Sequence, residues 1–302
     1  MSGAWGRSAL RSVRDWIAGV GELHRLSRSR EQNEYLQREV CRLNAAMRRA
    51  AWQARRRSGL ATQTKASFDF QWEHMPAGRA LPDDAVFMQG LAPHIAQLTG
   101  LPADWFRGKR IVDVGCGTGR YSYGLLKMGA TVTSCDHSEA ALRRTGELCH
   151  EFGARSTLKR VDLLEWDEPG DFDLAFSFGV VHHTGNTYLA MENVCRKVRP
   201  GGKVFFMIYG VPRTLAELRE INQYEHIAEE IHDLSLPQRK AWLERRFGAQ
   251  LAHGWFDATS PRINDRLTVE EIRDLLVELG FGGITRTMNT QNHHVIADRL
   301  AQ

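Results

Sequence analysis

Three glycines that directly follow a short apolar run constrain the fold of this chain more than any other feature. The run is Ile111-Val-Asp-Val114, and the glycines stand at positions 115, 117 and 119. Glycines there let the backbone turn sharply and let a ligand approach the main chain. The next segment, 120–128, has the pattern of a helix that Gly129 closes. Strand, glycine turn and helix together predict a nucleotide-type cofactor site at the carboxyl edge of a parallel sheet.

The spacing of the glycines separates two kinds of cofactor. A dinucleotide fingerprint, G-x-G-x-x-G, would need its third glycine at position 120, which is Arg120. The spacing here is G-x-G-x-G, and Asp113 at the strand end is a poor neighbour for a pyrophosphate. An acid there suits a cofactor that carries an ammonium group. The pattern therefore favours such a cofactor, and an NAD(P) enzyme stays the alternative.

Further β-rich segments follow, and most of them end at a polar or histidine-rich turn. Residues 131–135 lead to Asp136, 23 residues after Asp113, where an acid reaches both hydroxyls of a ribose. A third strand over 157–161 ends at Asp162-Leu163. A fourth begins at residue 173 and runs into His182-His183, and Arg-Pro-Gly-Gly before residues 204–209 marks the start of a fifth. Ser138 and Thr268 are expected helix N-caps, the latter in a capping box with Glu271.

Taken in order, these motifs resemble those of the class I S-adenosyl-L-methionine (SAM) methyltransferases. The resemblance extends over about 85–300, with its motifs in 110–209. It implies an α/β fold with a Rossmann-like, seven-stranded, mostly parallel sheet. The segments 284–287 and 294–297 are then an antiparallel hairpin at the sheet edge. The implied cofactor is SAM, and the implied product is S-adenosylhomocysteine.

The resemblance also implies a set of cofactor-binding residues. The glycine loop lies beneath the methionine part of SAM, Asp162 accepts from the adenine amino group, and Leu163 packs near the adenine ring. The aromatic residues at 68, 70 and 72 alternate as in a strand or a clasp. The segment is similar to F-x-x-Q-W elements, which implies a lid of Phe68, Gln71 and Trp72; a small hydrophobic anchor is the alternative. The predicted cofactor residues are Asp113, Gly115, Cys116, Gly117, Gly119, Asp136, His137, Asp162, Leu163, Phe178, Gly179, Gln71 and Trp72.

Histidines are the candidates for proton transfer, because their pKa suits neutral pH. His182 and His183 fall where the fourth strand meets the expected methyl group, and His182 is the first candidate; packing beside the cofactor is the alternative role. The predicted substrate-binding residues are Phe68, Tyr209, Trp255, Arg262 and Asn264. The two His-His pairs of the chain lack nearby acids that would complete a metal shell, so no metal is expected.

The predicted domains are an arm over 1–60, a lid or linker over 61–84, and a methyltransferase domain over 85–302 with a substrate insertion at 210–267. Two helices are expected in the insertion, near 214–234 and 237–246. The arm holds 13 arginines, no lysine and five acids, whereas the whole chain has a net charge of only +4. One long basic helix is expected over 22–57. Its apolar residues repeat by four and three from Leu36 to Ala54, which is a heptad stripe.

Three interpretations of the arm are open. It packs on its own domain or on a second copy in a homodimer, it makes peripheral contact with an acidic membrane surface, or it binds another protein or nucleic acid. The longest apolar run is far shorter than a membrane span. The five scattered cysteines predict reduced thiols and a cytoplasmic protein.

These features predict a cytoplasmic, SAM-dependent methyltransferase of small-molecule biosynthesis. It would move a methyl group to an oxygen or nitrogen of a small-molecule acceptor. The alternatives are an RNA, DNA or protein methyltransferase that uses the arginine-rich arm, and a SAM-binding scaffold subunit. No N-P-P-Y-type motif follows the fourth strand, which argues against methylation of a flipped base nitrogen.

Overall fold

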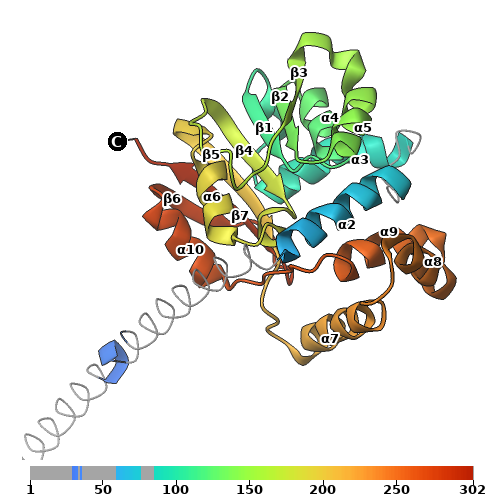
Figure 1. Ribbon diagram of the computed structural model, residues 1–302. Helices are drawn as coiled ribbons and strands as arrows, with labels where there is room; N and C mark the ends of the chain where they lie inside the picture. The colour runs from blue at the N-terminus through green and yellow to red at the C-terminus, as the bar shows by residue number, and fades with distance from the viewer. Residues whose placement is uncertain (1–28, 33–34, 36–58, 76–84, 302) are drawn as a thin grey trace, which may run out of the picture. The chain divides into compact units, whose positions relative to one another are not determined.

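The computed structural model describes residues 29–32, 35, 59–75 and 85–301 (Figure 1). The chain divides into two units, residues 1–48 and 49–302. In the first unit, residues 29–32 and Tyr35 are helical and exposed. The rest of the predicted 22–57 helix lies outside the described residues. The predicted dimer, membrane and nucleic-acid contacts of the arm therefore stay predictions.

The second unit contains the predicted seven-stranded sheet, in the order β3-β2-β1-β4-β5-β7-β6. Only β7 runs antiparallel to its neighbours, β5 and β6, among the described strands. The strand bounds are β1 Arg110–Val114, β2 Thr131–Asp136, β3 Ser156–Arg160, β4 Phe172–Phe178, β5 Val198–Ile208, β6 Phe281–Arg286 and β7 His293–Arg299. The parallel strands place their carboxyl ends, and the loops that follow them, on one edge of the sheet.

Helices cover both faces of this sheet and fill the segments before and after its parallel part (Figure 1). Their bounds are α2 Leu60–His74, α3 Ala85–Thr99, α4 Arg120–Lys127, α5 Glu139–Cys149, α6 Thr187–Cys195, α7 Leu215–Glu230, α8 Leu236–Phe247, α9 Ala249–Thr259 and α10 Val269–Glu278. Short 3-10 turns lie at Ala103–Phe106, His150–Arg155 and Val181–His183.

The two faces of the sheet bury alternate residues of each strand, as a parallel sheet covered on both sides requires. Ile111 of β1 packs in a core formed with α3, α4 and α5. Val112 and Val114 pack in the opposite core, formed with α6 and α10. Phe205 and Phe206 of β5 divide between the two cores in the same way. Because of this alternation, neighbouring side chains at the end of a strand lie on opposite faces of the sheet.

Local signals predicted most helix ends correctly. The Ser138 hydroxyl accepts a hydrogen bond from the Ala141 N–H (3.4 Å) at the start of α5, and Thr268 and Glu271 form the predicted capping box of α10. Gly129 and Gly280 have positive φ just after α4 and α10. The predicted start of the fifth strand was wrong: β5 begins at Val198, because Arg-Pro-Gly-Gly forms an irregularity inside the strand rather than a turn before it.

Residues 60–74 form one helix, α2, so the strand or clasp expected for Phe68 to Trp72 is wrong. The aromatic side chains of α2 are divided between two surroundings, which imitates the alternation of a strand. Phe70 packs on Phe256 of α9, with ring centroids 5.7 Å apart, while Phe68 and Trp72 face the sheet side. In Figure 1, α2 lies between the sheet and the helices α8 and α9.

The insertion over 210–267 holds three helices rather than the two expected. The predicted helices correspond to α7 and α8, and α9 was missed because Gly248 and Gly254 interrupt its pattern. The three helices form a small hydrophobic core of their own with Met75 and Phe70 of the α2 segment. The insertion and the α2 segment therefore make one layer over the carboxyl edge of the sheet.

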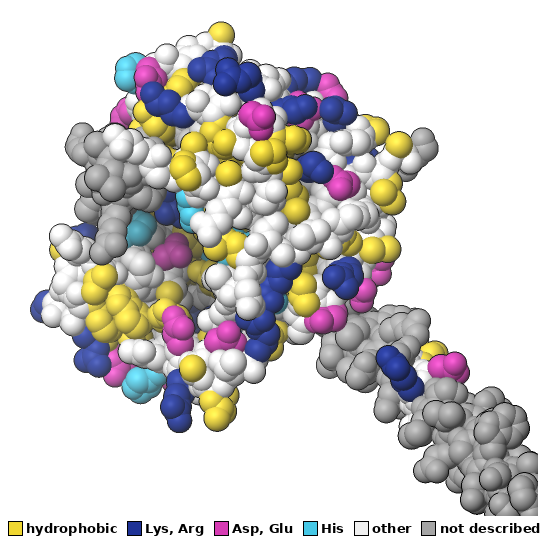
Figure 2. Space-filling model, turned by 180° about the vertical axis from the view of Figure 1, so that it is seen from behind, with side chains coloured by type: hydrophobic (Ala, Val, Ile, Leu, Met, Phe, Trp, Pro, Cys, Tyr) yellow, Lys and Arg dark blue, Asp and Glu magenta, His cyan; other side chains and the backbone are white. Residues whose placement is uncertain are grey.

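The surface of the second unit mixes charges. Basic and acidic side chains are interspersed over the face shown in Figure 2. A nucleic-acid-binding surface instead gathers lysines and arginines along one face. Within the described residues, no helix has the length and apolar character needed to cross a membrane.

Candidate active site

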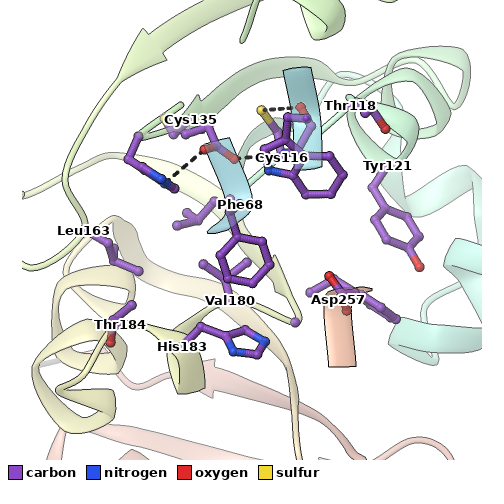
Figure 3. A pocket seen from close by; sticks show the side chains of 18 of the residues that line it. Phe68, Cys116, Thr118, Tyr121, Cys135, Leu163, Val180, His183, Thr184 and Asp257 are labelled. Atoms are coloured by element: carbon purple, nitrogen blue, oxygen red, sulfur yellow. Dashed lines mark hydrogen bonds and ion pairs between the residues drawn. The ribbon is translucent and has the colours of Figure 1, made fainter. Parts of the chain in front are cut away.

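A cavity of about 470 Å³ lies at the carboxyl edge of the sheet, beneath α2 and α9 (Figure 3). Its size is that of a small-molecule site. Of the predicted site residues, 13 line it: Phe68, Trp72, Gly115, Cys116, Gly117, Asp136, His137, Asp162, Leu163, Phe178, Gly179, His183 and Tyr209. The other seven do not: Gln71, Asp113, Gly119, His182, Trp255, Arg262 and Asn264.

The glycine loop after β1 forms the floor of the cavity. Gly115, Gly117 and Gly119 all have positive φ, a conformation that side chains disfavour. A Cβ at Gly117 would lie 3.2 Å from the Trp72 ring, so the glycine keeps the loop open toward the cavity. Gly119 instead supports the loop from behind, since a Cβ there would meet Thr145 at 2.8 Å. These contacts explain why two of the three glycines line the cavity and the third does not.

Asp136, at the end of β2, presents a fixed carboxylate to the cavity. Its Oδ2 accepts from the Gly117 N–H (3.0 Å) and its Oδ1 from the Ser138 N–H (2.9 Å). His137 Nδ1 also lies 3.3 Å from Oδ1, so it is Oδ2 that keeps a lone pair beyond its bond to Gly117. The main chain thus holds Asp136 rigidly while leaving it able to accept from a ligand.

Asp113 lies below the glycine loop rather than in the cavity. The strand alternation turns it to the α4 side of β1, where the Ser122 hydroxyl donates to its Oδ2 at 2.6 Å. Burial, together with the charge of Asp136, raises its pKa to about 7, against the hydrogen bond from Ser122. Asp113 is placed to support the loop and not to contact an ammonium group directly.

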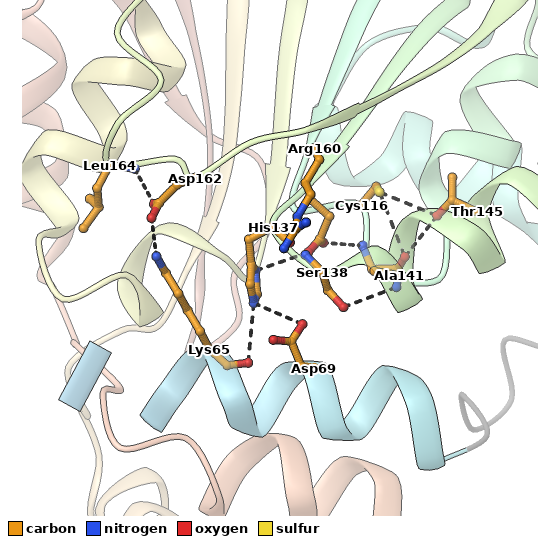
Figure 4. Close-up of polar contacts among 12 residues, drawn as sticks. Lys65, Asp69, Cys116, His137, Ser138, Ala141, Thr145, Arg160, Asp162 and Leu164 are labelled. Carbon is orange, nitrogen blue, oxygen red and sulfur yellow. Dashed lines mark hydrogen bonds and ion pairs between the residues drawn. The ribbon is translucent and has the colours of Figure 1, made fainter. Parts of the chain in front are cut away.

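Polar side chains of α2 connect this helix to the ends of β2 and β3 (Figure 4). Lys65 forms an ion pair with Asp162, whose Oδ1 also accepts from the Leu164 N–H. Although burial opposes it, this pairing holds the pKa of Asp162 below its usual value. His137 lies between Asp136 (3.3 Å) and Asp69 of α2 (3.6 Å), and despite its burial these carboxylates raise its pKa. Asp162, the carboxylate predicted to accept a hydrogen bond from an adenine amino group, is thus paired with Lys65.

His183 lines the cavity in a defined protonation form. Its Nδ1 lies 2.8 Å from the Ile263 carbonyl oxygen, which only accepts, so Nδ1 carries the proton. Nε2 is then an unprotonated nitrogen with no hydrogen-bond partner in the described part of the chain. Burial lowers the His183 pKa, against the charges of Asp257 and Asp265, so the ring is neutral at neutral pH. The Phe68 ring contacts it edge-on at 5.0 Å between centroids.

His182, the first catalytic candidate from the sequence, is turned away from the cavity and fully buried. Its ring packs 4.0 Å from the Tyr209 ring and 4.2 Å from that of His183, centroid to centroid. Neither ring nitrogen has a hydrogen-bond partner among the described residues. Burial, reinforced by the charges of His183 and Arg266, holds its pKa well below the usual value. Consecutive residues of a tight turn point in different directions, which reverses the predicted order of the two histidines.

Three of the predicted substrate residues lie elsewhere in the insertion. Trp255 stacks on Phe247 of α8 with centroids 4.2 Å apart. Arg262 contacts the His232 ring through its guanidinium and donates its backbone N–H to the Thr64 hydroxyl. Asn264 donates to the Pro261 carbonyl oxygen. These residues stabilise the layer above the sheet instead of lining the cavity.

The structure adds cavity residues that the sequence analysis missed. Gln250, His253, Gly254 and Asp257 of α9 line the cavity at the spacing of one helix face, and Trp255 lies off that face. Thr64 and Lys65 of α2 line it as well, one turn before Phe68. Gln71 lies on the adjacent face of α2, with its Nε2 3.1 Å from the His253 Nε2. The polar repeat at 250, 253 and 257 was the one signal that would have marked α9 as a cavity wall.

No cluster of three or more histidine, cysteine, aspartate or glutamate side chains suited to a metal ion occurs among the described residues. The four cysteines that the structure describes are free and buried. Burial raises the pKa of Cys116 well above its usual value, so this cavity thiol stays protonated.

The sheet order, the glycine loop and the strand-end acids together define a domain of the class I SAM-dependent methyltransferase type. More particularly, residues 111–202 match the family described as "Methyltransferase domain". This match runs from β1 into the start of β5 and ends before the insertion.

Comparison with curated proteins gives relatives over about a third of the chain. Ubiquinone biosynthesis O-methyltransferase of Dechloromonas aromatica is 36% identical over 100 residues, which are 32% of this chain and 43% of the relative. The enzyme of the same name from Agrobacterium fabrum is 34% identical over 99 residues, 32% of this chain and 40% of the relative. The chain thus spans about two fifths of the length of these relatives. Among solved structures, the Synechocystis magnesium protoporphyrin IX methyltransferase covers 70% of this chain and 83% of its own, with 19% identity and a TM-score of 0.47.

Proposed function

We propose that this protein is a SAM-dependent methyltransferase that methylates a hydroxyl oxygen of a small-molecule acceptor. The observation that carries the proposal is the cavity, which brings a glycine loop, two strand-end acids and a neutral histidine base together. The similarity to O-methyltransferases over about a third of the chain supports oxygen rather than nitrogen as the methylated atom.

The residues around the cavity fit SAM. Trp72 faces Gly117 across the loop, at a place where any side chain on the glycine would fill the space. The fixed Asp136 carboxylate suits the two hydroxyls of a ribose, and Asp162 with Leu163 suits an adenine edge and ring. Lys65 would then share Asp162 with the adenine amino group or leave it. Bound SAM supplies an activated methyl group on a sulfonium, with S-adenosylhomocysteine as the product.

His183 is the proposed general base. Its Nε2 would accept the proton of the acceptor hydroxyl as the oxygen forms its bond to the methyl carbon. The Ile263 carbonyl fixes the tautomer and the ring orientation that this step needs. The side chains of α2 and α9 enclose the cavity and would hold the acceptor in line with the methyl group, which supplies much of the rate.

Calorimetric titration with S-adenosylhomocysteine, with NADH as the control ligand, tests the cofactor. We expect binding of S-adenosylhomocysteine alone. Binding of NADH alone, or of neither ligand, would refute the proposal. A screen of phenols and catechols with methyl-labelled SAM then provides a working acceptor.

The pH dependence of turnover tests the base. Because the His183 pKa lies below its usual value near 6.5, kcat/KM should be level above about pH 6.5 and fall at lower pH as the ring is protonated. Asn at 183 keeps a donor to the Ile263 oxygen but offers no base. His183→Asn should lower kcat by about 100- to 10,000-fold and leave S-adenosylhomocysteine affinity unchanged.

His182→Leu is the matched control, since it removes the neighbouring histidine that does not line the cavity. It should keep the acidic limb of the pH profile. The assignment would be contradicted if His183→Asn kept full activity. It would also be contradicted if His182→Leu, but not His183→Asn, lost the decrease of kcat/KM at low pH.

A further inference from the structure

One cation at the cavity has no counter-ion among the residues that the structure describes. Arg120, the first residue of α4, lines the cavity and is half-buried. Its guanidinium carbon lies 4.6 Å from the centroid of the Tyr121 ring and 5.7 Å from that of Phe178. Among the described residues it makes no ion pair and no hydrogen bond. Lys65, the other cavity residue with a permanent positive charge, is by contrast paired with Asp162.

Arg120 lies over the half of the sheet that is remote from the proposed adenosine end. The Tyr121 ring beneath it packs on Phe176 and Phe178 of β4, and Phe178 faces His294 of β7. Asp136 ends β2 and Asp162 follows β3, on the other side of β1 in the sheet. Figure 3 shows Tyr121 and Leu163 on opposite sides of the cavity.

The surroundings of Arg120 suit a carboxylate on a flat molecule. The guanidinium fork matches the two oxygens of a carboxylate, and stacking on Tyr121 holds the fork in place before a ligand arrives. Phe68, Trp72 and Phe178 supply aromatic walls to the same cavity. Asp257 also lines the cavity, and its charge acts on both His183 and His253.

We propose that Arg120 binds an acidic group of the acceptor, so that the substrate class is an aromatic hydroxy acid. This inference rests on the proposed function, because it names the acceptor of that same site. The charge of Arg120 also acts on two histidines, of which only His253 lines the cavity. After burial, it is a further cause of the lowered pKa of His94 and contributes to that of His253.

Paired ligands that differ only in charge test the inference. The protein saturated with S-adenosylhomocysteine is titrated calorimetrically with 3,4-dihydroxybenzoate and caffeate, and then with their neutral methyl esters. We expect at least one acid to bind at least about tenfold more tightly than its ester. Arg120→Gln should make the affinities for the acid and its ester equal. Arg120→Lys should keep an affinity for the acid that is several-fold higher than that for the ester. An acid that binds no better than its ester in both pairs, or a preference that survives Arg120→Gln, would overturn the inference.

Arg246→Gln is the matched control. Arg246 also stacks on two aromatic rings, those of Trp242 and Phe247, but lies outside the cavity. The Arg246→Gln variant should keep the tighter binding of the acid over its ester. The thermal midpoints of both variants report whether they fold.

A second arm separates the acceptor from the carboxylate of the cofactor itself. 5′-Methylthioadenosine shares the adenosine part of S-adenosylhomocysteine and lacks its amino-acid end. Arg120→Gln should leave the affinities for both compounds unchanged within about twofold. Loss of affinity for S-adenosylhomocysteine alone would assign Arg120 to the cofactor and overturn the inference. If the wild-type protein binds neither compound, the proposed function fails instead.

Discussion

At the scale of single residues, main-chain contacts determine what the strand-end acids do. Asp136 accepts from two backbone N–H groups and still faces the cavity, whereas Asp113, of the same residue type, is buried beneath the loop. The sequence placed both acids correctly at strand ends. It did not reveal which one faces a ligand, because that depends on the sheet face that each side chain occupies.

Replacing Asp136 should weaken cofactor binding. Asp136→Asn removes the negative charge that would accept from both ribose hydroxyls, and each charge-assisted hydrogen bond is worth about 1.5–3 kcal/mol. We expect the affinity for S-adenosylhomocysteine to fall by about 10- to 100-fold in a calorimetric titration. Asp171→Asn, at an exposed acid paired with Arg110, should change nothing. Unchanged binding by Asp136→Asn would show that the ribose lies elsewhere.

Asp113 should make stability depend on pH. Its pKa is raised from an ordinary 3.8 to about 7 in the folded protein, so the folded state binds a proton that the unfolded state releases. Its contribution to stability is therefore complete below about pH 4 and is lost as the pH rises to about 7. Asp113→Asn should lose less free energy of unfolding between pH 5 and pH 8 than the wild type, measured by urea denaturation. Equal losses in the two proteins would mean that Asp113 is ionised throughout.

At the scale of elements, the sequence predicted the strands and the helices of the parallel part well. Short apolar runs, glycines and caps are local signals, and they are dense between residues 110 and 209. It failed for α2 and α9, the two helices that cover the cavity. Phe68, Phe70 and Trp72 alternate because α2 contacts the sheet side and α9 at once, so tertiary packing produces a pattern that imitates a strand.

The ion pair between Lys65 and Asp162 should help hold α2 on the sheet. Both side chains are about one-third exposed, so the pair is worth at most about 1 kcal/mol. Lys65→Met should speed hydrogen exchange of the α2 amides by about two- to fivefold and leave the β1 amides unchanged. Lys127→Met, which breaks the pair with Glu151 at the end of α4, is the control. Equal α2 exchange in all three proteins would show that aromatic packing alone holds this helix.

At the scale of the whole molecule, the cavity joins segments that are far apart in the sequence. Residues 111–202 match the methyltransferase family and supply the floor, while α2 and α9, nearly 180 residues apart, supply the cover. The family motifs could therefore predict the cofactor side from the sequence alone. The side formed by α2 and α9 could not be predicted, because Phe68, His253 and Asp257 meet this floor only in the folded chain.

This division predicts what truncation does. A chain of residues 49–302 keeps the whole second unit and should bind S-adenosylhomocysteine within about twofold of the full-length affinity. A chain of residues 76–302 lacks α2 and with it Lys65, Phe68 and Trp72. Because burying an aromatic side chain against a ligand contributes about 1.5–3 kcal/mol, the affinity should fall by at least about tenfold while circular dichroism still reports a folded sheet. Insolubility of the 49–302 chain would mean that the arm is part of the folded core, and full affinity of the 76–302 chain would show that α2 does not cover the cofactor.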